Sequence, residues 1–256
     1  MSSYGIWLSA AGMKVCEHQQ TLHANNLANA QTTGFKSDLA TFRQRPVESK
    51  ENGHAPHLRH PILDQLSGGV NVRPSRYDFT QGEIENTGRP LDVAIRGEGF
   101  FTVSDGRNKR LTRDGEFALN TAGELVLADA SGNWRVLDET GAVIRVDQTA
   151  GDVEIGNSGA VRQGTQAVAQ IRLKSPAEPQ RLRKIGANLF DHPPEEVMKA
   201  AAGTMVSASR EESNYNPLTG LTQMIEAARA YQMNATIMQL QDDATGQLVS
   251  RLGRVA

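Results

Sequence analysis

Two stretches near opposite ends of the chain combine helical spacing with a marked shortage of charge. Residues 18–35 contain no Lys, Arg, Asp or Glu, and residues 217–241 contain only Glu226 and Arg229. Both stretches are rich in Asn and Gln. A helix that faces water carries charged residues on its outer side. We therefore predict two helices whose surfaces pack against other protein, either within the chain or between copies of it.

Each stretch belongs to a longer periodic segment. Between about residues 3 and 30, small and apolar residues recur at steps of three and four and form one narrow stripe. Gly34 is predicted to take the left-handed cap that stops this helix. Pro217 opens the second helix, which can continue to Leu252 and would then be about 54 Å long. The first stripe comprises Ile6, Ala10, Met13, Cys16, Gln20, Ala24 and Leu27, and the second comprises Leu221, Ile225, Ala228, Tyr231, Ala235 and Met238.

The middle of the sequence has the texture of a β-domain. Short alternating runs at eight-to-twelve-residue spacing, separated by glycine-containing turns, predict strands. Asp105-Gly106 and Asp114-Gly115 are predicted hairpin-type turns. The predicted strands lie at 70–73, 91–95, 99–103, 116–119, 125–127, 143–146, 153–155 and 169–173.

Two irregular segments flank this region. Residues 36–68 and 175–212 mix charges with prolines and show no sustained period, so we interpret them as extended connectors. His54, His57 and His60 recur at a spacing of three, which raises a metal-site hypothesis. Nearby prolines would interrupt any helix that aligned them, and a solvated loop is the favoured interpretation.

Composition excludes several classes of function. A chain of 256 residues can hold one large or two modest domains. Its net charge of -2 argues against a nucleic-acid partner, which would call for a basic face. The single cysteine excludes an internal disulfide and a cysteine-based zinc site. The first residues predict no cleaved signal peptide, and no apolar run predicts a membrane span.

No catalytic or cofactor-binding motif emerges from the sequence. There is no phosphate-binding Walker loop, no nucleophile elbow and no zinc-binding helix motif. Gly97-Glu98-Gly99 lacks the third glycine and the following helix of a dinucleotide fingerprint. We therefore predict a protein that is not an enzyme and that uses no cofactor or metal.

Three blocks of sequence resemble one family. Residues 24–29 (ANNLAN) and 33–36 (TGFK) resemble the N-terminal signature of bacterial flagellar rod and hook proteins. Residues 92–103 and 112–117 are similar to the central β segment of that family, and 213–216 and 224–232 to its C-terminal helix. The blocks occur in the family's order, so together they are specific.

The resemblance implies a structural subunit of the flagellar basal-body rod. It implies an α+β fold in which residues 1–35 and 213–256 form a coiled-coil layer of terminal helices. Extended connectors at 36–90 and 175–212 would then surround that layer, with a β-rich outer domain at 91–174. The implied partners are copies of the chain, other rod proteins, hook or ring proteins, and the flagellar type III export apparatus. The implied location is the periplasm-spanning rod, reached without a cleaved leader, and the sequence fits proximal and distal rod types alike.

The predicted assembly interface follows from the two charge-poor stretches. Buried amides between packed helices fix their register, because an unpaired amide there costs about 1–3 kcal/mol. For each single residue an intramolecular role is an equally good interpretation. A hook subunit or a free-standing β-rich binding module remain alternative functions. The candidate interface residues are Asn25, Asn26, Leu27, Asn29, Gly34, Phe35, Ile225, Ala228, Tyr231, Ala235 and Met238.

Overall fold

The chain folds into two compact units. The computed structural model describes residues 2–46, 69–128, 134–147, 150–193 and 197–252. One unit, here called the helical unit, comprises residues 1–28, 38–76 and 217–256. The other, here called the β-rich unit, comprises residues 29–37 and 77–216. Terminal helices flanking a central β-rich region confirm the predicted α+β class.

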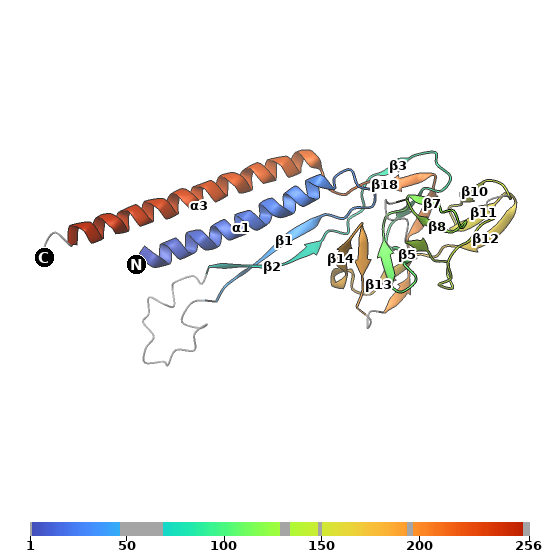
Figure 1. Cartoon of the computed structure of the whole chain (residues 1–256), viewed down its shortest axis with the longest axis horizontal. Coiled ribbons are helices and arrows are strands. Elements are labelled where there is room, and N and C mark those ends of the chain that lie inside the picture. Colours follow the sequence, from blue (N-terminus) through green and yellow to red (C-terminus); the bar gives the residue numbers. More distant parts are fainter. Residues whose placement is uncertain (1, 47–68, 129–133, 148–149, 194–196, 253–256) are drawn as a thin grey trace. The chain divides into compact units, whose positions relative to one another are not determined.

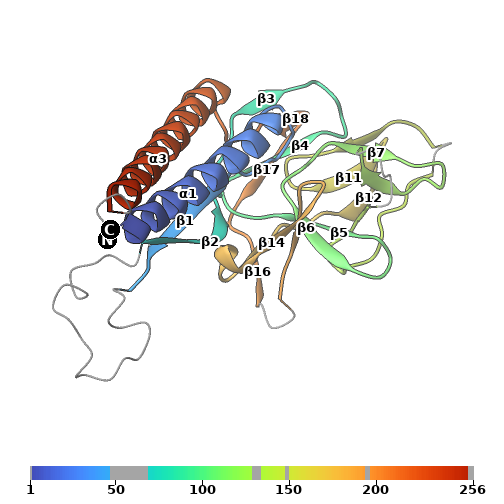
Figure 2. The same ribbon diagram turned by 60° about the vertical axis from the view of Figure 1, so that its left-hand side comes forward.

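Two long helices dominate the helical unit. Helix α1 spans Ser2–Ala28 and helix α3 spans Pro217–Leu252. They lie side by side and antiparallel, with the beginning of α1 beside the end of α3 (Figures 1 and 2). Both predicted helices are confirmed. Pro217 starts α3 because its missing N–H is not needed in the first turn.

A two-stranded ribbon completes the helical unit. Strand β1 (Asp38–Gln44) pairs with strand β2 (Val70–Tyr77), and β1 contacts α1. Residues 38–44 lie in the segment interpreted as an extended connector, and they form a β-strand there. The ribbon buries little of either face, so the alternation that marks a strand is weak in its sequence. His54, His57 and His60 lie outside the described residues.

The largest sheet of the β-rich unit has seven strands, in the order β14-β15-β6-β5-β9-β8-β7. The predicted turn at Asp105-Gly106 is confirmed, because it closes the β5–β6 hairpin. The Asp105 backbone N–H donates to the Asn108 carbonyl at 3.3 Å. Asp114-Gly115 does not close a hairpin, since it joins β6 to β7 and those strands are not neighbours. The strands are β5 (Phe101–Ser104), β6 (Lys109–Thr112), β7 (Phe117–Leu119), β8 (Leu125–Leu127), β9 (Arg135–Val136), β14 (Arg183–Gly186) and β15 (Leu189–Asp191).

Smaller sheets surround the seven-stranded one. Strands β10, β11 and β12 form an antiparallel sheet, and three further pairs join β3 with β18, β4 with β17 and β13 with β16. A short 3₁₀ helix, η3, spans Pro179–Arg181. The strands are β3 (Ile84–Asn86), β4 (Val93–Arg96), β10 (Val153–Ile155), β11 (Ala160–Gln163), β12 (Gln166–Gln170), β13 (Lys174–Pro176), β16 (Met198–Ala200), β17 (Thr204–Ser207) and β18 (Ser209–Glu211).

Residues 175–212 do not form the irregular connector that the sequence suggests. Their strands pair with strands much earlier in the chain: β15 with β6, β17 with β4 and β18 with β3. Each is only three or four residues long, so its pattern is too short to recognise locally. The predicted strand at 143–146 is also wrong, because Val143 and Arg145 form only isolated bridges.

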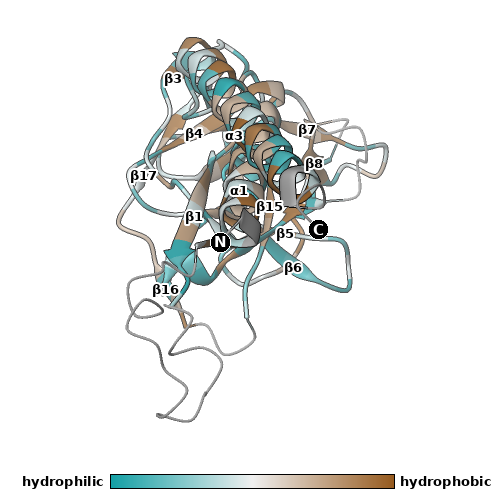
Figure 3. Cartoon of the chain, turned by 90° about the vertical axis from the view of Figure 1, so that its left-hand side faces the viewer, coloured by the Kyte–Doolittle hydropathy of each residue, from teal (hydrophilic) through white to brown (hydrophobic). Residues whose placement is uncertain are grey.

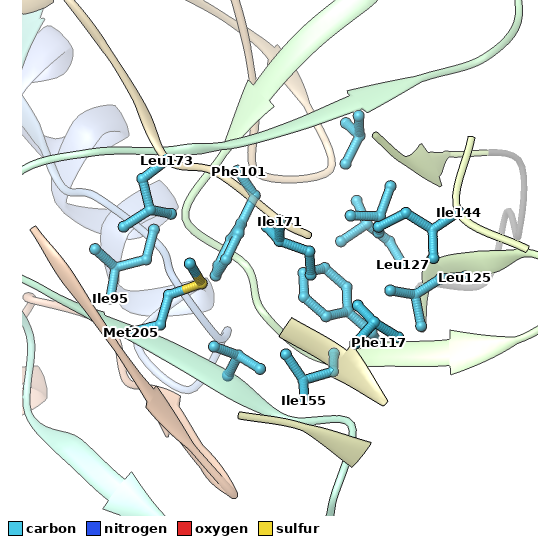
Figure 4. Packing of buried hydrophobic residues seen from close by; sticks show 14 of the residues in the cluster. Ile95, Phe101, Phe117, Leu125, Leu127, Ile144, Ile155, Ile171, Leu173 and Met205 are labelled. Atoms are coloured by element: carbon cyan, nitrogen blue, oxygen red, sulfur yellow. The ribbon is translucent and has the colours of Figure 1, made fainter. Parts of the chain in front are cut away.

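The β-rich unit has two hydrophobic clusters. The larger is built from fully buried side chains that converge between the sheets, among them Ile95, Phe101 and Phe117 (Figure 4). The smaller is aromatic: Phe100 and Phe190 are buried, with their ring centroids 5.8 Å apart. This core gives the unit a stable interior of its own.

Candidate assembly interface

Helix α1 meets α3 through small residues. A Cβ atom added to Gly5 would lie 2.7 Å from Gln241 Nε2, and one added to Gly12 would lie 2.8 Å from Asn234 Oδ1. Ser9 and Cys16 are buried on the same side of α1. Burial raises the pKa of the Cys16 thiol, which fits a packed side chain. The contact between the helices is therefore close, and amide side chains cover the glycines.

This contact face differs from the predicted stripe. The predicted α1 stripe includes Gln20 and Ala24, which are exposed, and shares only Cys16 with the contact residues. On α3, buried Ala227 lies seven positions before Asn234, which lies seven positions before Gln241. The sequence signal that was missed is the recurrence of small residues at steps of three and four along α1. These residues lie at positions 5, 9, 12 and 16.

Much of the apolar surface of α3 faces away from α1. Relative to the mean direction of Ala227, Asn234 and Gln241, five exposed apolar positions are turned by about 100 to 180° around the helix. Figure 3 shows hydrophobic residues beside hydrophilic ones along α3. The exposed apolar row contains Leu218 (75% exposed), Leu221 (43%), Ile225 (52%), Met233 (62%) and Leu240 (62%). We call it the outer row of α3.

The remaining candidate interface residues of α3 are partly covered. Ala228, Ala235 and Met238 are half-buried, and Tyr231 is 36% exposed. Of the candidate interface residues on α3, only Ile225 belongs to the outer row, where it lies with Leu221 of the predicted stripe.

Asn26 has an intramolecular role. It is 1% exposed, and its side-chain amide donates from Nδ2 to the Asp38 carbonyl at 2.9 Å. The Asp38 backbone N–H donates back to Asn26 Oδ1 at 2.8 Å. Asn26 thus ties the end of α1 to the start of β1, and its amide is not offered to another subunit. Its neighbours Asn25 and Leu27 are exposed and half-buried, respectively.

Replacing Asn26 by alanine is expected to destabilise the helical unit by about 1–3 kcal/mol, because it removes two part-buried hydrogen bonds between the Asn26 amide and the Asp38 backbone. Denaturant unfolding followed by circular dichroism at 222 nm measures the loss. Asn25→Ala, on the exposed side of the same turn, is the matched control and should change stability by less than about 0.5 kcal/mol. Equal effects of the two substitutions would contradict the assigned role of Asn26.

Three predicted interface residues belong to the β-rich unit. Asn29 starts a turn, in which the Thr32 backbone N–H donates to its carbonyl at 3.1 Å. Gly34 has φ of +67°, but α1 ends at Ala28, so Gly34 is not the helix cap. Phe35 is 4% exposed, with Lys184 Nζ 4.0 Å from its ring centroid. Gly34 and Phe35 are therefore structural residues of this unit rather than contacts to a neighbour.

A buried charge cluster joins the two segments of the β-rich unit. Lys36 Nζ lies 2.5 Å from Glu211 Oε1, and Arg113 NH1 lies 3.2 Å from Glu211 Oε2. The side chains of Lys36 and Glu211 are fully buried. The Gly34 N–H donates to the Glu211 carbonyl at 2.7 Å. Burial lowers the pKa of Lys36, and the Glu211 carboxylate opposes that shift.

Comparison with known proteins identifies the family. The family model described as the flagellar hook protein FlgE/F/G D1 domain matches residues 94–163, and the one for the flagellar basal body rod FlgEFG protein C-terminal matches residues 206–251. A flagellar basal-body rod protein FlgF of Caulobacter vibrioides is 33% identical, covering 91% of this chain and 91% of the relative. A FlgG of Bacillus subtilis is 30% identical, covering 96% of this chain and 97% of the relative.

The chain belongs to the flagellar basal-body rod protein family.

As a member of the rod family, the chain is a structural subunit of the flagellar basal body and functions in motility. The family is not an enzyme class. Within the described part of the chain, no three His, Cys, Asp or Glu side chains are grouped to hold a metal ion. No described helix is long and apolar enough to cross a membrane.

Proposed function

We propose that this rod subunit assembles by packing its α1–α3 pair against the helix pairs of neighbouring copies. The helices then form a coiled-coil inner layer of the rod, and the β-rich unit lies outside it. The main support is the outer row of α3, where Ile225 is 52% exposed and Met233 and Leu240 are each 62% exposed. Fully burying one such side chain contributes about 1.5–3 kcal/mol.

The character of the α1–α3 contact supports the same proposal. Its buried face consists of small and amide residues, with Gly5 and Gly12 against Gln241 and Asn234. Such a face fixes register but buries little apolar area, so the apolar residues of α3 are left for another partner. Seven-residue spacing along that face is typical of coiled coils. A patch on one copy meeting a different patch on the next builds an open helical filament.

The wider partners follow from family membership. We infer contacts with other rod proteins and with hook or ring proteins at the ends of the rod. We also infer passage through the flagellar type III export apparatus and a final position across the periplasm. These inferences rest on the family and on the resemblance of the N-terminal and C-terminal blocks.

Ile225→Asp is expected to block incorporation into the rod, because it places a charge in the outer row of α3. The purified variant should keep the wild-type melting temperature within a few degrees, since Ile225 is half-exposed in the monomer. Recovery in basal bodies, from cells whose only copy is the variant, measures incorporation. Ile185→Asp, the same substitution at a 48% exposed residue of the β-rich unit, is the matched control and should assemble. Normal assembly of Ile225→Asp would refute the packing proposal.

A further inference from the structure

A basic groove lies beside the β1–β2 ribbon. It has a volume of about 630 Å³ and is lined by Lys14 of α1 and by residues of both strands. We propose that this groove binds the acidic pair Asp242 and Asp243 on α3 of a second copy of the chain. The proposal rests on the packing of helix pairs described above and names one contact within it.

The groove carries a cluster of positive charge. Among the described residues, four cationic side chains line it, Lys14, Arg43, Arg45 and Arg73, and no carboxylate does. In the described part of the chain, Lys14, Arg43 and Arg73 form no ion pair. The Arg45 guanidinium lies over Trp7, 5.2 Å from the ring centroid. An anionic partner therefore gains from three or more cations at once.

The acidic pair is the matching feature on α3. Asp242 and Asp243 are both exposed and form no ion pair with the described residues. Exposed Leu240 lies three positions before Asp243, which places it on the same side of the helix. The groove offers exposed apolar side chains in return, Val70 at 41% and Val72 at 40%. Charge and apolar surface thus match on the two sides.

Within one chain the described residues do not pair the two features. Neither Asp242 nor Asp243 forms an ion pair with a described cation of the groove. The groove and the acidic pair are different patches of the chain, so a contact between copies joins unlike surfaces and can repeat from copy to copy along an open filament.

Charge reversal tests the contact. We expect Asp242→Lys with Asp243→Lys, or Arg43→Glu with Arg73→Glu, to lower incorporation into rods by about tenfold or more, because like charges then face each other. Combining all four substitutions in one chain should restore incorporation, since the pairs re-form with reversed signs. Recovery in basal bodies, from cells that make only the variant, is the measurement. Asp152→Lys with Glu154→Lys, two exposed acids of the β-rich unit, is the matched control.

The outcomes separate this contact from the packing of the outer row. If both reversals assemble normally while Ile225→Asp does not, the helix packing stands and the groove contact is wrong. If only the Arg43 and Arg73 reversal fails and the four-fold variant stays defective, the groove binds a different acidic partner and the proposal is overturned. Failure of each reversal with recovery of the four-fold variant supports the contact between copies.

Discussion

Replacing Glu211 by glutamine is expected to lower the free energy of unfolding of the β-rich unit by about 3–5 kcal/mol, because two buried cations lose their common counter-charge. The Glu211 carboxylate faces Lys36 at 2.5 Å and Arg113 at 3.2 Å. It also accepts the Gly82 backbone N–H at 3.1 Å. A neutral amide cannot balance either cation, and its NH₂ group would face a donor.

Urea unfolding, followed by the near-ultraviolet circular dichroism of the aromatic core, measures this loss. Glu212→Gln is the matched control, because its side chain is 45% exposed and its ion pair with Arg210 is near the surface. It should cost less than about 1 kcal/mol. A loss that small for Glu211→Gln would show that the cluster does not stabilise the unit. Removing all three charges together, with apolar residues of similar size, should recover most of the stability.

Gly34→Ala is expected to cost about 2–5 kcal/mol, from backbone strain of about 1–2 kcal/mol and crowding of about 1–3 kcal/mol. Gly34 has φ of +67°, a conformation that other L-residues adopt only with strain. A Cβ atom there would lie 2.5 Å from the Arg113 carbonyl carbon and 2.6 Å from the Asp114 nitrogen. Both atoms are backbone, so no side-chain rotation relieves the clash.

Gly88→Ala separates the two causes of that loss. Gly88 has φ of +70°, but a Cβ atom added to it would meet nothing within 4 Å. It should therefore show the strain alone, about 1–2 kcal/mol. Thermal melts of the two variants in parallel give the comparison. If Gly88→Ala were as damaging as Gly34→Ala, the close approach of Arg113 would have no energetic role.

The helices and several strands could be predicted because their signals are local. A helix of 36 residues repeats its pattern many times, and α3 begins and ends where the sequence indicates. Strands such as β4 and β5 are buried apolar runs with clear turns beside them. By contrast, β15, β17 and β18 are three or four residues long and pair with strands much earlier in the chain. Pairing such as Met205 with Ile95 is a property of the tertiary fold and leaves little trace in either segment alone.

The candidate interface was predictable only in part. The shortage of charge in the terminal segments indicated helix packing, but it could not separate the face of α3 that meets α1 from the face left open. The pairing of Asn26 with Asp38, and the burial of Phe35 beneath Lys184, depend on where the chain turns after α1. The Lys36–Glu211–Arg113 cluster was missed because burial of charge cannot be inferred from charged residues in a sequence.

The position of Glu211 in the chain also governs how the β-rich unit can fold. Its two cationic partners come from residues 36 and 113, and the strand that carries it, β18, pairs with β3. Contacts that span so much sequence carry a large loop-closure cost and form slowly. A chain truncated before residue 209 lacks β18 and leaves Lys36 and Arg113 without the carboxylate that they share. The unit therefore closes only when nearly the whole polypeptide is available, and partial chains stay open.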